Sequence, residues 1–426
     1  MRSRKTAEEV VWQKRVLTVF VTLFIALVLV GGVLLFISAL SIIFTRDGGI
    51  NPPYDETGGF SAGQLAGIVD PPASMLPQYD PINEAITDII ASMSLREKVC
   101  QMLIVTPDAI TGVSGTTVAG SITRSAIEQY PVGGLILFSP NIVNSNQVST
   151  FNSTVQTYSE IPLFISVDEE GGRVTRLMTA LQTYYVGAML NYQNDDDQVA
   201  YNNAKTIADA LSAHGFNLDF APVADVWSNS ANTVIGDRAY STDYNTAARL
   251  VAAAVRGFRA SGIACTLKHF PGHGDTYEDT HDSLAYVSKS LNDLRQNEFK
   301  PFVAGIEAGA EMVMIGHIIV QNVDDKPASL SKTLVTDILR GELGFKGVVI
   351  TDALEMGGIA WNYSSQYIAV TAVNAGVDIL LMPPNVDATI AALIEAVESG
   401  EIPESRIDES VRRILRLKVD LGLITL

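Results

Sequence analysis

The stretch KHFPGHGDTYEDTH, residues 268–281, concentrates side chains that can do chemistry. Three of the five histidines of the chain, His269, His273 and His281, lie in it, with carboxylates between them. A histidine can bind a metal ion, transfer protons or hydrogen-bond to neighbouring backbone groups. Because each role needs different partners, the residues around the three histidines decide which role is available.

A metal site is one use that this stretch allows. His269 and His273 are four residues apart, but Pro271 and Gly272 lie between them, so the helical spacing of a metal pair does not apply. A zinc ion also needs a third protein ligand. The residues available for it are Asp275, Asp279 and His281. A metal-dependent hydrolase stays open as an alternative, while the interpretation we favour needs no metal ion and no other cofactor.

Acid–base chemistry is the role that the end of the stretch favours. In Asp279-Thr280-His281, an imidazole lies two residues from a carboxylate that can accept one ring N–H. Such a contact fixes the tautomer and raises the basicity of the other ring nitrogen. A histidine held in this way can donate and accept a proton near neutral pH. We therefore predict an Asp279–His281 acid/base pair, with a purely structural loop as the other reading.

A histidine acid/base needs a partner, and Asp352 in VVITDALEMGG is the candidate. It directly follows an apolar run and precedes a glycine-containing turn. An aspartate in that place is often only a helix cap. The sequence offers no G-x-S-x-G elbow, no Walker loop and no nucleotide-binding GxGxxG fingerprint as a source of different chemistry. A carboxylate nucleophile suits glycosyl transfer, in which it traps an oxocarbenium-like centre as an ester.

Two further polar clusters are suited to binding a ligand. VDEEGGRVTRL contains Asp168, Arg173 and Arg176 around a diglycine turn, and VIGDRAY contains Arg238. Each arginine taken alone is explained by a surface ion pair, the usual arrangement next to an acidic residue. As a set at one end of a fold, the aspartate and the arginines are suited to a polyhydroxylated ligand.

These residues are positioned by short apolar runs that alternate with longer amphipathic stretches. Strands that are apolar on both faces and alternate with helices indicate a parallel sheet covered by helices. Eight such units predict an α/β fold, a (β/α)8 barrel of the TIM type, with the open doubly wound sheet as the alternative. The predicted strands are 101–105, 134–138, 163–168, 217–225, 264–270, 312–317, 348–352 and 378–382. The clearest predicted helices are 199–213, 245–260, 291–308, 365–375 and 388–398.

Polar residues gather at the carboxyl ends of these runs. In a barrel those ends meet at one face, where the loops between strands and helices build the active site. We therefore expect the side chains at these ends to share one site. They are Asp168, Asp225, Lys268, His269, His317 and Asp352.

The N-terminal region differs from the rest of the chain. Residues 16–45 carry no charge, and a run of that length spans a bilayer, which needs about 20 residues. Basic residues in 1–15 predict a cytoplasmic tail and an outward-facing remainder. A cleaved signal peptide is the alternative, although its apolar core is usually about 7–15 residues. We predict a single-pass anchor in the cell membrane, a flexible Gly- and Pro-rich linker at 46–80, and an extracytoplasmic catalytic domain at 81–426.

Charge and cysteine content limit the partners of this domain. The formal net charge is −18, so we expect no binding to nucleic acid and no membrane contact except through the N-terminal helix. The two cysteines, Cys100 and Cys265, sit in apolar contexts and are predicted to be buried thiols. One disulfide between them stays open in an exported protein, but there is no disulfide framework.

At this point the motifs resemble those of a known family. KHFPGHGDTYEDTH, VDEEGGRVTR, DFAPVADV, VIGDRAY and ITDALEM are similar, in compatible order, to motifs of glycoside hydrolase family 3. They resemble its bacterial β-N-acetylhexosaminidase branch over residues 83–423. The resemblance implies a barrel and retaining hydrolysis of terminal β-linked N-acetylglucosamine, with sugars derived from peptidoglycan as natural substrates.

The resemblance also implies roles for single residues. Asp352 matches the nucleophile, His281 the acid/base and Asp279 its carboxylate partner. The residues that match the contacts to the N-acetylglucosamine unit are Asp168, Arg176, Arg238, Lys268 and His269. The chain has Asp-Thr-His where this branch usually has Asp-Ser-His, so Thr280 puts the geometry and mobility of that loop in doubt.

Other functions remain open. The β-glucosidase branch takes a glutamate acid/base from a second domain, for which we expect no room before Leu426. A glycoside phosphorylase would use phosphate in place of water at the same site. A non-catalytic wall-binding protein is a further alternative, which the retained catalytic motifs disfavour.

Overall fold

The eight apolar runs become the eight strands of one parallel sheet in the computed structural model, which describes residues 80–276 and 284–426. The strand order is β10-β1-β2-β3-β4-β5-β7-β9, so the strands follow one another around the sheet. Their bounds are β1 (Leu103–Val105), β2 (Gly134–Ile136), β3 (Phe164–Val167), β4 (Leu218–Asp219), β5 (Ala264–Phe270), β7 (Met312–Ile315), β9 (Val348–Thr351) and β10 (Leu380–Leu381).

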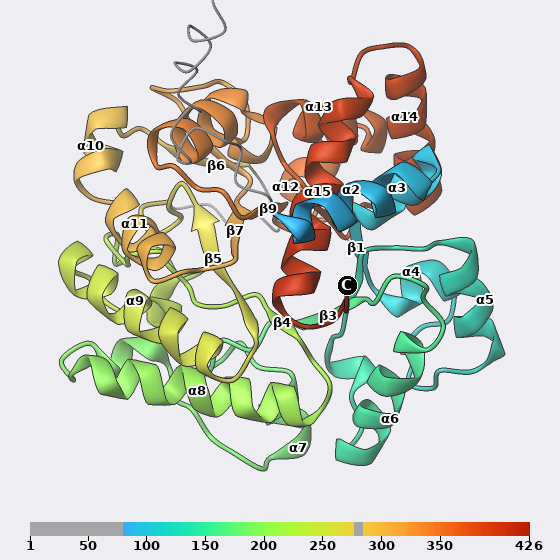
Figure 1. The fold of residues 1–426 in the computed structure, drawn as a ribbon. Coiled ribbons are helices and arrows are strands. Elements are labelled where there is room, and N and C mark those ends of the chain that lie inside the picture. Colours follow the sequence, from blue (N-terminus) through green and yellow to red (C-terminus); the bar gives the residue numbers. More distant parts are fainter. Residues whose placement is uncertain (1–79, 277–283) are drawn as a thin grey trace, which may run out of the picture. The chain divides into compact units, whose positions relative to one another are not determined.

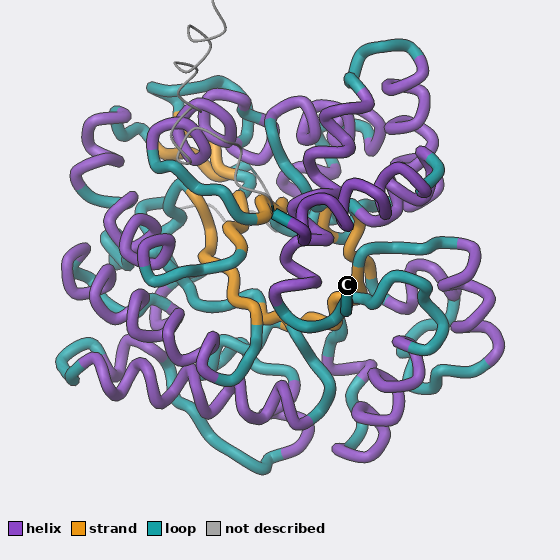
Figure 2. Tube along the Cα trace, viewed as in Figure 1, coloured by secondary structure: helices purple, strands orange, loops and turns teal. Residues whose placement is uncertain are grey.

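Backbone hydrogen bonds bring the two ends of the sheet together. The amides of Asp378 and Ile379 donate to the carbonyl of Val349 (2.8 and 3.0 Å), and the amide of Thr351 donates to the carbonyl of Ile379 (3.0 Å). Figure 2 shows the strands as an inner ring with helices around it. This nearly closed parallel ring agrees with the predicted (β/α)8 barrel rather than with an open doubly wound sheet.

The helices form the outer layer of the barrel (Figure 1). They begin with α2, whose first turn is capped by the carboxylate of Asp80. The α-helices are α2 (Pro81–Ser92), α3 (Leu95–Gln101), α4 (Pro107–Thr111), α5 (Ser121–Gln129), α6 (Ser145–Gln156), α7 (Leu177–Leu181), α8 (Asp197–Ala213), α9 (Tyr244–Ala260), α10 (Leu291–Gln296), α11 (Phe299–Glu307), α12 (Gly357–Ala360), α13 (Ser365–Ala375), α14 (Val386–Glu398) and α15 (Glu404–Asp420). Short 3₁₀ turns and one π-helix, η6 (Thr333–Glu342), complete the connections.

The apolar faces of these helices explain why they cover the sheet. In α9, Leu250, Val251, Ala254 and Phe258 recur on one side of the helix and are all buried. This spacing gives a stripe that packs inward while the opposite side meets water. All seven residues of β5 are buried, because that strand lies between the helix layer and the barrel interior.

One predicted helix is interrupted. Residues 291–308 form α10 and α11, which are separated at Asn297 and Glu298. The Glu298 carboxylate is buried, where it accepts a hydrogen bond from the Tyr244 hydroxyl (2.8 Å) and pairs with Lys289. The break lets this side chain turn inward, which the periodicity of the sequence did not indicate. The other four predicted helices are confirmed within two residues at each end.

A second small sheet was not predicted. Strands β6 (Ala285–Val287) and β8 (Ile318–Val320) pair in parallel outside the barrel, and Tyr286 lies opposite Ile319. Each strand has only three residues, too few to produce a recognisable alternation in the sequence. Both lie in connections that leave the carboxyl ends of barrel strands, so they belong to the face that carries the polar cluster.

The remaining sequence predictions divide into tested and untested ones. Cys100 and Cys265 are buried free thiols, as predicted. Among residues 80–276 and 284–426, no helix is long and apolar enough to cross a membrane. The predicted tail at 1–15, the anchor at 16–45 and the linker up to residue 79 lie outside the described residues.

Lys418 on α15 gives a stability prediction. It is fully buried, its Nζ donates to Oε1 of Gln101 (2.8 Å), and burial lowers its pKa to about 7. A lysine in the unfolded chain keeps its proton up to about pH 10.4, so the folded protein binds fewer protons between about pH 7 and pH 10. The free energy of unfolding therefore rises with pH across this window, by at most about 1.4 kcal/mol per pH unit.

We predict that Lys418→Met removes this rise. Urea unfolding in buffers from about pH 6 to about pH 10 measures it. Lys326→Met, at an exposed lysine, is the control. In this variant the free energy of unfolding should rise with pH as steeply as in the wild type. If the free energy of unfolding rises equally steeply with pH in the wild type and in Lys418→Met, Lys418 is charged in the folded protein.

Candidate active site

A cavity of about 350 Å³ lies at the carboxyl ends of the strands. Its walls come from residues in or directly after strands β2, β3, β5, β7, β9 and β10 and from the connection after β4, elements that are far apart in the sequence. The structure thus brings together six of the eight predicted site residues. These are Asp168, Arg176, Arg238, Lys268, His269 and Asp352. The other two, Asp279 and His281, lie outside the described residues, so the predicted acid/base pair is not tested.

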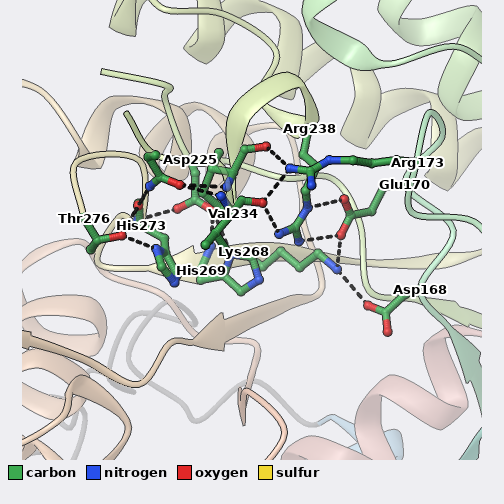
Figure 3. A network of polar contacts seen from close by, with 12 residues as sticks. Asp168, Glu170, Arg173, Asp225, Val234, Arg238, Lys268, His269, His273 and Thr276 are labelled. Carbon is green, nitrogen blue, oxygen red and sulfur yellow. Dashed lines mark hydrogen bonds and ion pairs between the residues drawn. The ribbon is translucent and has the colours of Figure 1, made fainter. Parts of the chain in front are cut away.

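Glu170 holds two of the predicted ligand-binding cations in place (Figure 3). Its carboxylate accepts two hydrogen bonds from Arg238, Nε to Oε2 and Nη2 to Oε1, both 2.8 Å. The Lys268 Nζ lies 2.6 Å from Glu170 Oε1 and 2.8 Å from Asp168 Oδ1. A fork of two parallel bonds fixes a guanidinium in one orientation. Arg238 and Lys268 are therefore prepositioned before any ligand arrives.

Oppositely charged neighbours keep the buried side chains of Glu170 and Lys268 ionised. Burial by itself raises the pKa of Glu170, but Arg238 and Lys268 lower it much further, so the carboxyl is ionised far below neutral pH. Burial by itself lowers the pKa of Lys268, and the Asp168 and Glu170 carboxylates more than reverse this. Each charge in the cluster thus depends on the others, as expected for buried ions.

Arg176 is positioned differently from Arg238. The buried Glu169 carboxylate accepts the backbone N–H of Arg176 (2.7 Å) and Leu177 (2.8 Å), which fixes the start of α7. The Arg176 guanidinium lies 5.5 Å from the centre of the Phe138 ring, in the cavity wall. Within residues 80–276 and 284–426, no carboxylate forms an ion pair with it. It is therefore the cavity cation best placed to bind a neutral polar ligand.

His269 is oriented by Asp225, which lies in the connection after β4. Its Nδ1 lies 2.7 Å from Asp225 Oδ2, and the amide of His273 donates to Asp225 Oδ1 (2.6 Å). Burial by itself raises the pKa of Asp225, but His269 and these hydrogen bonds outweigh it and leave the pKa lowered. An ionised Asp225 can only accept from Nδ1, so Nε2 is the ring nitrogen left for a ligand.

Asp352 meets the electrostatic requirement for a nucleophile. Its Oδ1 accepts the backbone N–H of Ala353 (2.8 Å). Burial by itself raises the pKa of Asp352, but His269, His317 and the Ala353 N–H lower it below its usual value. The carboxylate is therefore ionised at neutral pH and lies in the same cavity as the cations.

His317 supports the segment next to Asp352. Its Nε2 lies 3.1 Å from the carbonyl oxygen of Ala353, and its Nδ1 lies 2.8 Å from the Ser329 hydroxyl. A carbonyl oxygen can only accept, so Nε2 carries a proton there. The sequence indicates His317 only as a polar residue at a strand end, whereas its contact with the Ala353 carbonyl oxygen makes it a positioning residue.

The other residues of the motifs have simpler roles. Arg173, which the sequence grouped with Arg176, forms an exposed ion pair with Asp237 (2.9 Å) and lies outside the cavity lining, so the surface explanation holds for it. His273 is buried, and its Nδ1 lies 2.7 Å from the Thr276 hydroxyl. In the part of the chain that the structure describes, no group of three or more His, Cys, Asp or Glu side chains is arranged to hold a metal ion.

Glu170 is the site residue that sequence reasoning missed. It stands in VDEEGGRVTRL beside two other acidic residues, and no periodicity tells which of the three turns inward. A short Asp-Glu-Glu run before a diglycine turn was a weak signal, since the partners Arg238 and Lys268 are distant in the chain. Only the closure of the barrel brings them together.

Comparison with known proteins gives the family of the chain. Residues 94–417 match the family described as glycosyl hydrolase family 3 N terminal domain. The chain belongs to glycosyl hydrolase family 3. It is therefore a glycoside hydrolase by family, and the resemblance noted in the sequence is confirmed.

Several similar proteins are named β-hexosaminidase or β-N-acetylglucosaminidase, and one similar structure is named a β-glucoside phosphorylase. A β-hexosaminidase A of Pseudoalteromonas piscicida is 35% identical over 69% of this chain, and the chain spans 54% of that relative, about half its length. A β-hexosaminidase of Stenotrophomonas maltophilia (strain R551-3) is 38% identical over 66% of this chain and 85% of that protein. A family 3 β-N-acetylglucosaminidase from Paenibacillus sp. str. FPU-7 has a similar structure, with a TM-score of 0.74 and 38% identity, covering 79% of this chain and 65% of that one.

Proposed function

We propose that this protein is a retaining exo-β-N-acetylglucosaminidase. The observation that carries the proposal is the ionised Asp352 carboxylate in one cavity with Asp168, Lys268 and Arg176. A buried anion next to hydrogen-bond donors suits a reaction in which positive charge develops on a sugar ring. The names of the family 3 relatives support N-acetylhexosamine as the sugar.

In the proposed mechanism, the sugar binds with its hydroxyl groups against Asp168, Arg176, Arg238, Lys268 and His269. An Asp352 oxygen attacks the anomeric carbon while His281, held by Asp279, donates a proton to the glycosidic oxygen. The bond to the leaving group breaks, and a glycosyl–Asp352 ester forms. Water then enters, His281 removes its proton, and the ester is hydrolysed with net retention.

A panel of aryl glycosides tests the sugar specificity. We expect hydrolysis of the β-N-acetylglucosaminide and much slower hydrolysis of the glucoside and the xyloside. Preference for glucose or xylose would place the chain with the β-glucosidase branch. The assays are run with and without phosphate, because formation of a sugar 1-phosphate would reveal a phosphorylase. Loss of activity on chelation, restored by zinc, would favour the metal-dependent alternative, and no turnover at all would favour a wall-binding protein.

The role proposed for His281 has a distinctive kinetic consequence. A general acid contributes typically about 10²–10⁴-fold, and a good leaving group needs it least. His281→Ala should therefore lose much more activity on a poor leaving group, such as a methyl or sugar aglycone, than on a dinitrophenyl aglycone. The measurement is kcat/KM across a series of aglycones, with Thr280→Ser as the control. Equal losses on all aglycones would exclude His281 as the acid.

For the whole chain we propose a cell-membrane protein with one anchor at 16–45 and an extracytoplasmic catalytic domain. The uncharged length of the run and its basic N-terminal flank support this orientation. Substrates derived from peptidoglycan would then be within reach. Proteolysis of intact cells, followed by detection of the barrel, tests the proposal, and a protected barrel would contradict it.

A further inference from the structure

Aromatic side chains occur in two connections that leave the carboxyl ends of barrel strands β5 and β9, outside the residues of the proposed mechanism. Trp361 is 75% exposed, and Tyr286 and Tyr367 are 42% and 43% exposed. The Tyr367 ring stacks on that of Tyr363, with 5.4 Å between centroids and 14° between planes. We call these four residues the aromatic patch. Single exposed aromatic residues are ordinary, but a group of them at one place marks a binding surface.

The patch is continuous with the cavity wall. Met356 lines the cavity and caps the start of α12, and Trp361 directly follows the end of that helix. At a rise of about 1.5 Å per residue, Trp361 lies about 8 Å further along the helix than Met356. The nucleophile Asp352 is four residues before Met356 in the same connection. The backbone of Trp361 thus lies a short distance along α12 from the cavity wall.

The tyrosines extend the patch over a neighbouring connection. Tyr286 lies on β6, in the connection after β5, and its side chain is the one exposed position of that strand. Burial raises the pKa of Tyr363, and the phenols of Tyr367 and Tyr286 raise it further, so the three phenols lie near one another. Rings from the connections after two barrel strands therefore share the face that carries the cavity.

Trp361 has no evident structural task. Within the described residues, no stacking or cation–π contact involves its ring, and three quarters of its surface is open to water. A large apolar ring held in water is unfavourable unless a ligand covers it. A pyranose ring has an apolar face of C–H groups that stacks well on an indole or a phenol. The patch carries no formal charge, which also suits a neutral carbohydrate.

We propose that the aromatic patch binds the sugar units on the leaving-group side of the scissile bond. This rests on the proposed function, because an exo-acting enzyme keeps the terminal sugar in the cavity and must lead the remaining glycan out over its rim. The cavity, about 350 Å³, is near the lower end of the range for ligand pockets, about 300–1,000 Å³. A longer glycan therefore extends past Met356 onto Trp361. The preferred substrate class is an oligosaccharide of several β-linked N-acetylglucosamine units.

The experiment compares one-sugar and several-sugar substrates. Wild type, Trp361→Ala and Trp361→Phe are assayed on an aryl N-acetylglucosaminide and on N-acetylglucosamine oligosaccharides of increasing length. We expect Trp361→Ala to lower kcat/KM on the oligosaccharides about tenfold, equivalent to about 1.4 kcal/mol, mainly through KM. Its kcat/KM on the aryl substrate should change less than about twofold, and Trp361→Phe should restore most of the loss.

Tyr185→Ala is the matched control, because Tyr185 is 80% exposed on the connection after β3 and belongs to no part of the patch. It should leave both substrate classes unchanged. An equal loss on both classes in Trp361→Ala, or no loss on either, would overturn the proposal. If wild type hydrolyses none of these substrates, the proposed function fails, and the patch is then tested by oligosaccharide binding. Quenching of fluorescence that is absent in Trp361→Phe supports the patch, and its persistence in that variant overturns it.

Discussion

Replacing Asp352 with alanine is expected to abolish turnover of an aryl β-N-acetylglucosaminide almost completely. Deleting one member of a catalytic unit typically lowers kcat by roughly 10⁴-fold or more. The structure supports this size of effect, because the ionised Asp352 carboxylate lies in the cavity and its pKa is held low by its surroundings. The loss should appear in kcat, since the binding residues remain in place.

Added azide distinguishes a lost nucleophile from general damage. In Asp352→Ala the small anion can enter the vacated space and attack the anomeric carbon from the same side as the missing carboxylate. The product should be the α-glycosyl azide. In His281→Ala the glycosyl–Asp352 ester still forms, so azide should attack from the opposite side and give the β-glycosyl azide. Product configuration, measured by NMR, therefore assigns the two roles independently of rate.

Asp168→Asn is the matched control, because Asp168 lies in the same cavity and pairs with Lys268 (2.8 Å). It should raise KM and show no azide rescue. If Asp352→Ala kept more than a few per cent of the wild-type kcat without azide, Asp352 would not be the nucleophile. That result would favour the metal-dependent mechanism.

Much of the fold was predictable from the sequence, for a physical reason. Strands buried on both faces are mostly apolar, with polar residues where they face the cavity, and the predicted strand 264–270 coincides with β5 to the residue. Short strands are harder, because β4 and β10 have only two residues each, yet their surrounding apolar runs were still found. What failed was local detail, such as the inward turn of Glu298 that divides α10 from α11.

The cavity residues were predictable to a similar extent. Asp168 and Asp352 directly follow barrel strands, Lys268 and His269 lie near the carboxyl end of β5, and barrel geometry requires such positions to converge. Long-range partners were not predictable. Glu170 binds Arg238, 68 residues away in the chain, and nothing in either local sequence indicates that pairing. A single sequence shows which side chains can do chemistry, whereas the fold decides which charges neutralise one another.

Replacing Glu170 with alanine is the second large effect that we expect. The Glu170 and Arg238 side chains are only 2% and 12% exposed, and Lys268 is 3% exposed. Removing the shared carboxylate leaves Arg238 with only its hydrogen bond to the Val234 carbonyl oxygen and leaves Lys268 with Asp168 as its one remaining carboxylate partner among the described residues. Breaking a buried pair by removing one partner costs about 3–5 kcal/mol of unfolding free energy. The measurement is urea unfolding at neutral pH.

The exposed ion pair between Arg173 and Asp237 is the matched control for the stability effect, because Asp237 directly precedes Arg238 in the chain. Both side chains are nearly half exposed, so Asp237→Ala should cost less than about 1 kcal/mol. A similar cost for the two variants would mean that Glu170 contributes no more than a surface carboxylate.

The pH dependence of the Glu170 effect separates charge from packing. The folded-state pKa of Glu170 lies far below its usual value, so its electrostatic contribution is complete above the unfolded-state pKa, about 4.3. It declines as pH falls from there through the folded-state pKa. The stability difference between wild type and Glu170→Gln should therefore be constant from about pH 7 to about pH 5 and shrink in stronger acid. Glu170→Gln keeps the shape of the side chain and removes its charge. If the stability difference between this variant and the wild type stays constant down to about pH 3, packing and hydrogen bonding cause the effect, and the charge that prepositions Arg238 and Lys268 does not.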